Sequence, residues 1–285
     1  MLSADGGRAS TTIPTVGVGG RGIPALEFTL RTAGKDGHSG SFGGAARNAP
    51  HEMAALIASL HDRDGRMEVT DFGDDATPIS EAMHAAAAAL PFTVRERVTL
   101  RPTIEVNGLW GGYTSAGTKT VLPSEAHAKI TMRLAPGMDP SRSRRRLVDH
   151  LERHVPPGVA FPISPDQGGV PAPDPARRSS LLAVALRVQQ RLHGRPAVPA
   201  RMGGTVPITA IFREMLGMDS LTHGLAMPDE DVHAPNEFFR LSSLDEGLRS
   251  WPMLLSELGG LSASDFAPFR HPTAPDLPFS RPLTA

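Results

Sequence analysis

Residues 125–134 alternate strictly between apolar and polar side chains, and this pattern constrains the fold more than any other feature of the chain. A period of two is typical of a strand with one buried face and one face in water. Arg133 falls on the wet face. Such half-buried strands are common in antiparallel sheets. Residues 26–31 alternate in the same way, and residues 103–106 predict a further strand.

Two amphipathic helices are predicted between these strands. Asn48 can cap the first, and its apolar residues follow at helical spacing: Met53, Leu56, Ile57 and Leu60. Asp139 and Pro140 predict the start of the second, with a stripe of Leu147, Val148, Leu151 and Val155. With a last strand near residues 159–163, the order is β-α-β-β-α-β. Residues 22–167 therefore predict an α+β unit, a four-stranded antiparallel sheet with two helices.

A linker over residues 168–175 and a second, helical unit are predicted next. Its first helix begins at Asp174 and ends before Gly194, and Thr205 caps the next helix, whose stripe is Ile208, Ile211, Phe212 and Met215. A last helix is centred on residues 251–258. A capping box of Ser243 and Glu246 would leave Pro252 inside that helix, so we expect a kink or a later start. Residues 262–285 carry five prolines and predict a loose tail.

Composition excludes several classes of function. Lys and Arg number 29 against 30 Asp and Glu, a formal net charge of −1, which argues against nucleic-acid or membrane binding through bulk charge. No apolar run is long enough to predict a membrane span, and the first residues lack the pattern of a secretory signal. We therefore expect a cytoplasmic protein. The chain has no cysteine, so any metal ion would be held by His, Asp or Glu.

Three stretches carry residues suited to chemistry, and each has a plainer alternative. His233 follows the acidic residues 229–231 and is a candidate metal ligand, or a solvated loop histidine. The glycines of Gly203-Gly204-Thr205 allow a ligand to approach the backbone before a helix, or they form an ordinary turn. His38 lies in a glycine-rich loop and, taken alone, would be a surface histidine.

The order of short motifs along the chain is more specific than any one of them. They are Arg21-Gly22, Gly-Lys-Asp-Gly-His-Ser-Gly-Ser-Phe-Gly-Gly at 34–44, Asn48, Gly-Thr-Lys-Thr-Val-Leu-Pro at 117–123, Arg-Leu-Ala-Pro-Gly at 133–137, Gly-Gly-Thr-Val-Pro at 203–207 and His-Ala-Pro-Asn-Glu at 233–237. Together they resemble the dinuclear zinc peptidases and amidohydrolases, a family that includes carnosine-type dipeptidases, aminoacylase, glutamate carboxypeptidase and acetylornithine deacetylase. The runs at 38–44 and 118–123 are most similar to the dipeptidase branch.

The resemblance implies a division of the chain. Residues 1–21 would end the first segment of an α/β catalytic domain, 22–167 would form its lid and dimerisation domain, and 168–261 would form its C-terminal segment. The implied reaction is metal-dependent hydrolysis of a peptide or amide bond, in a dipeptide or an N-acyl amino acid. Two Zn²⁺ ions per site would polarise the carbonyl and generate hydroxide. The implied partner is a second copy, bound through the lid.

The resemblance also implies roles for five residues. His38 would reach into the active site of the partner subunit and steady the scissile carbonyl as it becomes an oxyanion. Thr120 and Arg133 would hold the free carboxylate of the substrate, which suits a planar guanidinium. Gly204 and Thr205 would contact the substrate.

The implied metal site is incomplete in this sequence. His233 matches the C-terminal zinc ligand, but the other ligands of the family come from an N-terminal half with a His-x-Asp pair, a bridging Asp and a Glu-Glu pair. None of the eleven histidines precedes x-Asp, and no Glu-Glu occurs. A catalytic zinc needs three protein ligands, so we expect this chain to lack that half and to be inactive alone. It would otherwise be a non-catalytic dimerisation module or one half of a split enzyme.

A missing half would also affect packing. The C-terminal unit would then lack elements that it packs on, and apolar faces such as Leu181, Val188 and Leu192 would be poorly covered. Exposed apolar patches of this kind mark a missing partner or a tendency to aggregate.

Overall fold

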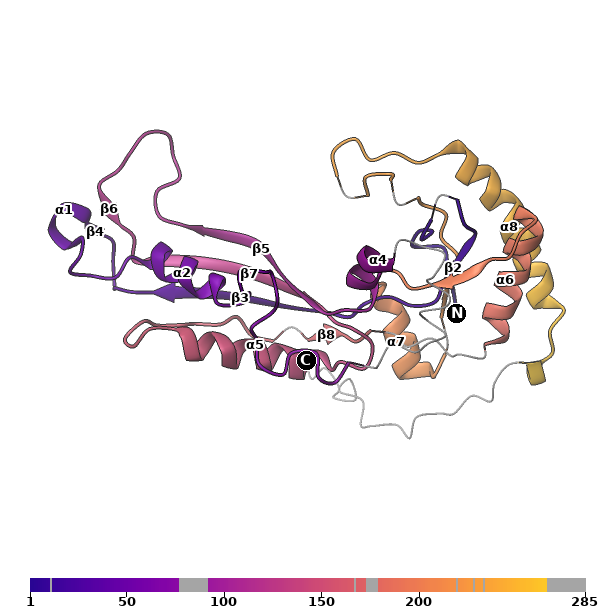
Figure 1. Cartoon of the computed structure of the whole chain (residues 1–285), viewed down its shortest axis with the longest axis horizontal. Helices are drawn as coiled ribbons and strands as arrows, with labels where there is room; N and C mark the ends of the chain where they lie inside the picture. The colour runs from indigo at the N-terminus through magenta and orange to yellow at the C-terminus, as the bar shows by residue number, and fades with distance from the viewer. Residues whose placement is uncertain are drawn as a thin grey trace, which may run out of the picture. The chain divides into compact units, whose positions relative to one another are not determined.

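The computed structural model describes residues 1–10, 12–76, 92–166, 168–172, 179–218, 220–227, 229–232 and 234–265. The chain divides into two compact units (Figure 1). Unit 1 comprises Met1–Arg21, Ile79–Leu100 and Pro173–Ala285, and unit 2 comprises Gly22–Pro78 and Arg101–Ala172. Within the described ranges, no helix is both long and apolar enough to cross a membrane.

Unit 2 is built on an antiparallel sheet with the strand order β5-β7-β3-β8. The strands are β3 (Ile23–Arg31), β5 (Thr103–Gly111), β7 (Glu125–Arg133) and β8 (Gly169–Val170). The two central strands pair from Ala25 opposite Thr131 to Arg31 opposite Glu125. The strand expected from the alternation at 125–134 is thus confirmed as β7, in the middle of the sheet.

The two faces of β7 differ as the alternation requires. On one face the side chains of Ala126, Ala128, Ile130 and Met132 are buried. The other face is partly exposed and carries ion pairs to β3, with Arg31 2.7 Å from Glu125 and Lys129 3.6 Å from Glu27. These pairs are solvated and contribute little to stability, so the buried face provides most of the free energy that holds the sheet.

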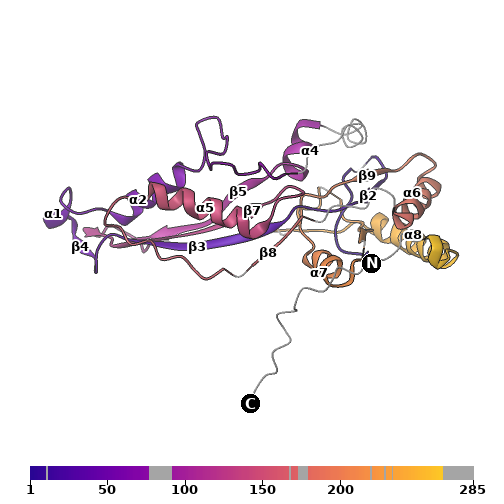
Figure 2. The ribbon, with the colours of Figure 1, turned by 90° about the horizontal axis from the view of Figure 1, so that it is seen from below.

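Two helices cover the apolar face, α2 (Ala49–Ala58) and α5 (Pro140–His154) (Figure 2). Both predicted caps are confirmed. The side chain of Asn48 accepts a hydrogen bond from the backbone N–H of His51, and Asp139 accepts one from that of Arg142 at 2.7 Å. The predicted stripes enter one core with the sheet: Met53, Leu56, Leu60, Leu147 and Leu151 are almost fully buried.

The expected strand near residues 159–163 is present only as two isolated bridges to β3, at Ala160 and Ile163. The continuous pairing on this side of β3 comes later, at β8. Pro162 and Pro165 lack the N–H groups that a ladder needs, which explains why the edge is interrupted.

At one end of unit 2 lies a second, two-stranded sheet. Strand β4 (Gly37–His38) pairs with β6 (Val121–Leu122), and the short helix α1 (Ser39–Phe42) follows β4 (Figure 1). We call these three elements the tip.

Unit 1 has a sheet of four short strands in the order β1-β10-β2-β9. They are β1 (Leu2–Ser3), β2 (Thr15–Gly17), β9 (Val198–Ala200) and β10 (Leu221–Thr222). The helices are α4 (Phe92–Thr99), α6 (Ser180–His193), α7 (Pro207–Leu216) and α8 (Leu241–Gly259), followed by the 3₁₀ turn η1 (Ala263–Asp265).

Helix α6 is better covered than expected. Leu181 and Val188 lie in a core with Val16, Leu221 and Leu254, because α8 and the sheet pack on them, so the expectation of a poorly covered α6 is wrong. Gly194 ends α6 in the left-handed conformation as predicted, whereas the predicted start at Asp174 lies outside the described residues. The exposed apolar side chains of unit 1 include several on α7 (Ile208, Ile211, Met215) and on α8 (Leu241, Leu244, Leu248, Leu255).

The later start considered for the last helix is wrong, and Ser243 and Glu246 do not form a capping box. Helix α8 begins at Leu241, so Ser243 and Glu246 lie inside it, as does Pro252. The carboxylate of Glu246 is held by buried Arg8 at 2.6 Å and lies 3.2 Å from Nε2 of His193. A side chain that is paired with a distant arginine is not available to cap its own helix.

The junction of α2 and α5 yields a prediction about pH. His150 is buried, and its Nε2 lies 3.0 Å from both the hydroxyl and the carbonyl oxygen of Ser59. Burial, aided by His154, lowers the pKa of His150 below its ordinary value. At this position the unfolded chain binds a proton more readily than the folded chain. The contribution of His150 to stability is therefore fully present above about pH 6.5, and it is lost as the pH falls through the pKa of the folded state.

We therefore expect His150→Gln to reduce the loss of stability between about pH 7 and pH 5, measured by urea unfolding at each pH. His51→Gln, at an exposed position on α2, is the control and should leave the pH dependence as it is. Equal pH dependence in the His150 variant and the parent would contradict this account.

Candidate functional site

The tip brings two of the predicted site residues together. In the β4–β6 ladder His38 lies opposite Val121, and the backbone N–H of Ser39 donates to the carbonyl oxygen of Thr120 at 3.1 Å. Both His38 and Thr120 are exposed. The two residues are far apart in sequence, and the antiparallel pairing alone makes them neighbours.

The imidazole of His38 is held loosely. Its Nδ1 lies 3.5 Å from Oγ of Ser41, at the limit of a hydrogen bond. A Cβ at Gly40 would come within 2.8 Å of the ring, so the glycine leaves room for the imidazole. The side chain is therefore free to contact a molecule outside its own chain.

Arg133 lies at the other end of unit 2. It is the last residue of β7, whereas Thr120 precedes the first residue, Glu125. A nine-residue strand spans about 26 Å at 3.3 Å per step. One copy of the chain therefore does not bring Arg133 to the same small carboxylate as Thr120 and His38.

In unit 1 the turn at 203–205 is tied to the segment before Gly22. The N–H of Arg21 donates to the carbonyl oxygen of Gly204 at 3.1 Å, and Nε of Arg21 donates to that of Gly203 at 3.0 Å. A Cβ on Gly20 would lie 2.2 Å from the oxygen of Gly204, so only glycine permits this approach. The turn is therefore fixed in place before α7 begins.

The structure corrects one part of the prediction for this turn. Thr205 does not cap α7, because its hydroxyl donates to the carbonyl oxygen of Arg21 at 2.7 Å. The N-cap residue is Val206, which makes no side-chain cap. Gly217 ends the helix in the left-handed conformation, as predicted.

The predicted metal ligand His233 lies outside the described residues, but the loop around it is informative. Glu230 is buried and accepts hydrogen bonds from the backbone N–H groups of Met227 and Arg240, at 2.8 and 3.1 Å. The guanidinium of Arg240 also binds Glu230 at 3.1 Å and Asp229 at 2.8 Å. The hydrogen bond with Asp229 is the main cause of a raised pKa of Arg240.

Two of the three carboxylates next to His233 thus hold the loop in shape. Sequence reasoning missed Arg240, because no local motif links it to residues ten and eleven positions earlier. Across the described ranges, no group of three or more His, Asp or Glu side chains is arranged to hold a metal ion.

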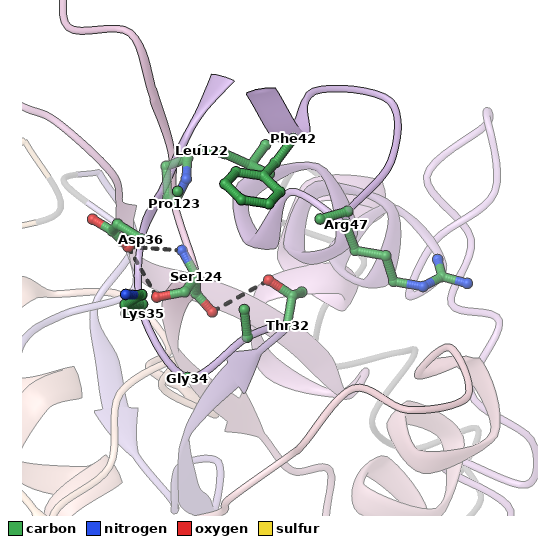
Figure 3. Close-up of a pocket in the computed structure, with 12 residues that line it drawn as sticks. Thr32, Gly34, Lys35, Asp36, Phe42, Arg47, Leu122, Pro123 and Ser124 are labelled. Atoms are coloured by element: carbon green, nitrogen blue, oxygen red, sulfur yellow. Dashed lines mark hydrogen bonds between the residues drawn. The ribbon is translucent and has the colours of Figure 1, made fainter. Parts of the chain in front are cut away.

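Sequence reasoning also missed a cavity beside the tip, formed by the 32–37 loop, Phe42–Arg47 and residues 122–124 (Figure 3). The sequence gives little indication of this cavity, because glycines, alanines and a proline form much of its lining and these residues match no binding motif.

Known proteins share both the domain and the fold. The M20 peptidase dimerisation domain matches residues 22–159. Residues 22–159 therefore form an M20-type peptidase dimerisation domain. It is 25% identical over 271 residues to human Beta-Ala-His dipeptidase, covering 87% of this chain and 53% of that protein. It is 24% identical over 268 residues to Cys-Gly metallodipeptidase DUG1 of Candida albicans, covering 84% and 54%.

Solved M20 structures show the same fold. The dipeptidase Dug1p from Saccharomyces cerevisiae matches with a TM-score of 0.81 at 19% identity, covering 91% of this chain and 59% of that one. Human carnosine dipeptidase 1 matches with a TM-score of 0.79 at 22% identity, with the same coverage. The resemblance to the dipeptidase branch is confirmed. The chain spans about half the length of the curated M20 relatives it matches.

The loop around His233 yields a prediction. Arg240→Met removes the cation that pairs with Asp229 and Glu230, so the loop should open more often and the N–H of Met227 should exchange faster with deuterium. Hydrogen exchange followed by NMR measures this. Arg249→Met, which removes a pair with exposed Asp245 only, is the matched control. Unchanged exchange at Met227 would show that Arg240 does not hold the loop.

Proposed function

We propose that this chain provides the lid and the C-terminal catalytic segment of a metal-dependent hydrolase of dipeptides or N-acyl amino acids. The observation that carries the proposal is the tip, where His38 and Thr120 are adjacent, exposed and distant from Arg133. The M20 domain match and the dipeptidase relatives support the reaction class.

Each site residue has a role in this proposal. His38 of one copy donates a hydrogen bond to the developing oxyanion of a substrate bound to a second copy, a position where charge stabilisation has a large effect on rate. Thr120 contacts the same substrate. Arg133 holds the free carboxylate, and Gly204 and Thr205 present backbone and hydroxyl groups to the substrate.

The described residues do not by themselves fit a zinc site. In the sequence His233 follows three acidic residues, of which Asp229 and Glu230 are engaged by Arg240. We propose that two Zn²⁺ ions bind only when a further segment, outside residues 1–285, supplies more ligands beside His233. The exposed apolar faces of α7 and α8 support this, since surfaces of this kind mark binding sites for another polypeptide.

The second copy is proposed to bind at β5, which is an edge strand of the sheet in unit 2. It exposes Val106, Leu109 and Trp110, by 41, 53 and 43%. An unpaired strand edge with exposed apolar side chains favours pairing with another chain, and a two-fold dimer would bury the same strand from each copy.

The alternative function is a non-catalytic dimerisation module. It is favoured by the domain match over residues 22–159 and by the lack of a three-ligand group within the described ranges. The two candidate functions predict different results when a metal-binding segment is added: the hydrolase would gain activity, and the dimerisation module would not.

We predict that Leu109→Glu weakens the dimer about tenfold or more, because it places a charge in an apolar contact that the proposed dimer would bury. Sedimentation equilibrium measures the dissociation constant. Leu248→Glu, on the exposed face of α8, is the control and should leave the dimer intact. A dimer of unchanged affinity in the Leu109 variant would exclude β5 as the interface.

We predict that the purified 285-residue chain retains no stoichiometric zinc after dialysis and does not hydrolyse β-alanyl-histidine or cysteinyl-glycine. Metal analysis and a ninhydrin assay measure both. Tightly held zinc in the chain alone would contradict the proposed division of ligands.

The same assay separates the two functions. Added polypeptide with the His-x-Asp and Glu-Glu motifs should restore turnover, and His38→Ala should then reduce kcat about a hundredfold, while His51→Ala should not. If a folded complex forms and binds zinc without any turnover, the chain is a dimerisation module.

A further inference from the structure

The cavity beside the tip has the size and lining of a small-molecule site. Its volume is about 550 Å³, within the range of ligand pockets. Figure 3 shows the ring of Phe42 beside Leu122 and Pro123, with Thr32 and Ser124 opposite. Most of the lining is apolar.

The walls of the cavity are fixed by hydrogen bonds. Oδ1 of Asp36 accepts from both the backbone N–H and the hydroxyl of Ser124, each at 2.9 Å. These two bonds hold the pKa of Asp36 below its ordinary value, so the carboxylate stays ionised and engaged. The N–H of Thr32 donates to the carbonyl oxygen of Ser124 at 2.9 Å. The cavity is therefore formed before any ligand arrives, which lowers the entropic cost of binding.

Glycine at position 37 places the aromatic ring. A Cβ there would lie 3.0 Å from the ring of Phe42, so a side chain at position 37 would displace the ring by a few tenths of an ångström. Phe42 is 51% exposed, so half of its surface remains available to a ligand.

The rim of the cavity carries charges of both signs, the cations of Lys35 and Arg47 and the carboxylate of Asp36. Arg47 is paired with Glu52 at 2.9 Å, and Asp36 is engaged with Ser124. Within the described parts of the chain, exposed Lys35 makes neither a hydrogen bond nor an ion pair. An unpaired ammonium next to an apolar lining favours a ligand that has an anion joined to a hydrophobic group.

We propose that this cavity binds a small hydrophobic carboxylate, with its apolar group against Phe42 and Leu122 and its carboxylate beside Lys35. The inference goes beyond the proposed reaction, because binding here needs neither a metal ion nor a further segment. The alternative occupant, a side chain of a second copy, is one outcome of the test.

The test is calorimetric titration of the full chain with three probes. N-acetylleucine should saturate one site per chain. The amide of N-acetylleucine lacks the attraction to Lys35 and should bind about threefold more weakly. Acetate lacks the apolar group and should bind at least about tenfold more weakly than N-acetylleucine. Equal binding of the three probes, or no saturable binding of N-acetylleucine, would overturn the proposal.

Variants assign the contacts. Lys35→Met should weaken N-acetylleucine about threefold and leave its amide unchanged, whereas Phe42→Ala should weaken both about tenfold. Lys129→Met and Phe239→Ala are the matched controls, at exposed positions outside the cavity, and circular dichroism checks that each variant folds.

Parent-like binding by both cavity variants would place the ligand elsewhere and refute the proposal. Affinity for N-acetylleucine that falls as protein concentration rises would show that a second copy fills the cavity, and would also refute it. Because no step involves hydrolysis, either failure leaves the proposed function standing.

Discussion

The antiparallel ladder between β3 and β7 is the interaction on which unit 2 depends. Seven consecutive residue pairs fix which side chains of both strands face α2 and α5. A shift by one residue would turn the buried set toward water, so the register is strongly specified. The same ladder sets the separation of the two ends of the unit, with the tip beyond Glu125 and Arg133 at the opposite end.

This separation determines which of the proposed site residues one copy of the chain can bring together. His38 and Thr120 lie at the tip, and Arg133 lies at the opposite end of the sheet. Because the sheet is rigid, one copy does not bring these three residues to the same small substrate. In the proposed function a second copy supplies one half of such a site, which would give the dimerisation domain a role in catalysis as well as in assembly. The network of Arg240, Asp229 and Glu230 serves a different purpose, since it holds the shape of the loop that precedes His233.

Local patterns predicted the parts of the fold that local physics decides. Alternation identified β3 and β7, and Asn48 and Asp139 identified the starts of α2 and α5, because these signals act within a few residues. The failures involve partners from far along the chain. Thr205 bonds to Arg21 and Glu246 bonds to Arg8, so neither caps its helix. The motifs identified His38 and Thr120, but only the β4–β6 pairing shows them to be neighbours.

We propose that the tip of one copy lies close to the turn at residues 203–205 of a second copy. The chain has no cysteine, so Thr120→Cys accepts a single nitroxide spin label. Mixing this labelled chain with an unlabelled, ¹⁵N-enriched copy restricts the observed NMR signals to the second copy. The account predicts paramagnetic broadening of the amide signals of Gly203, Gly204 and Thr205 in that copy. A mixed dimer in which these three signals stay sharp would contradict it.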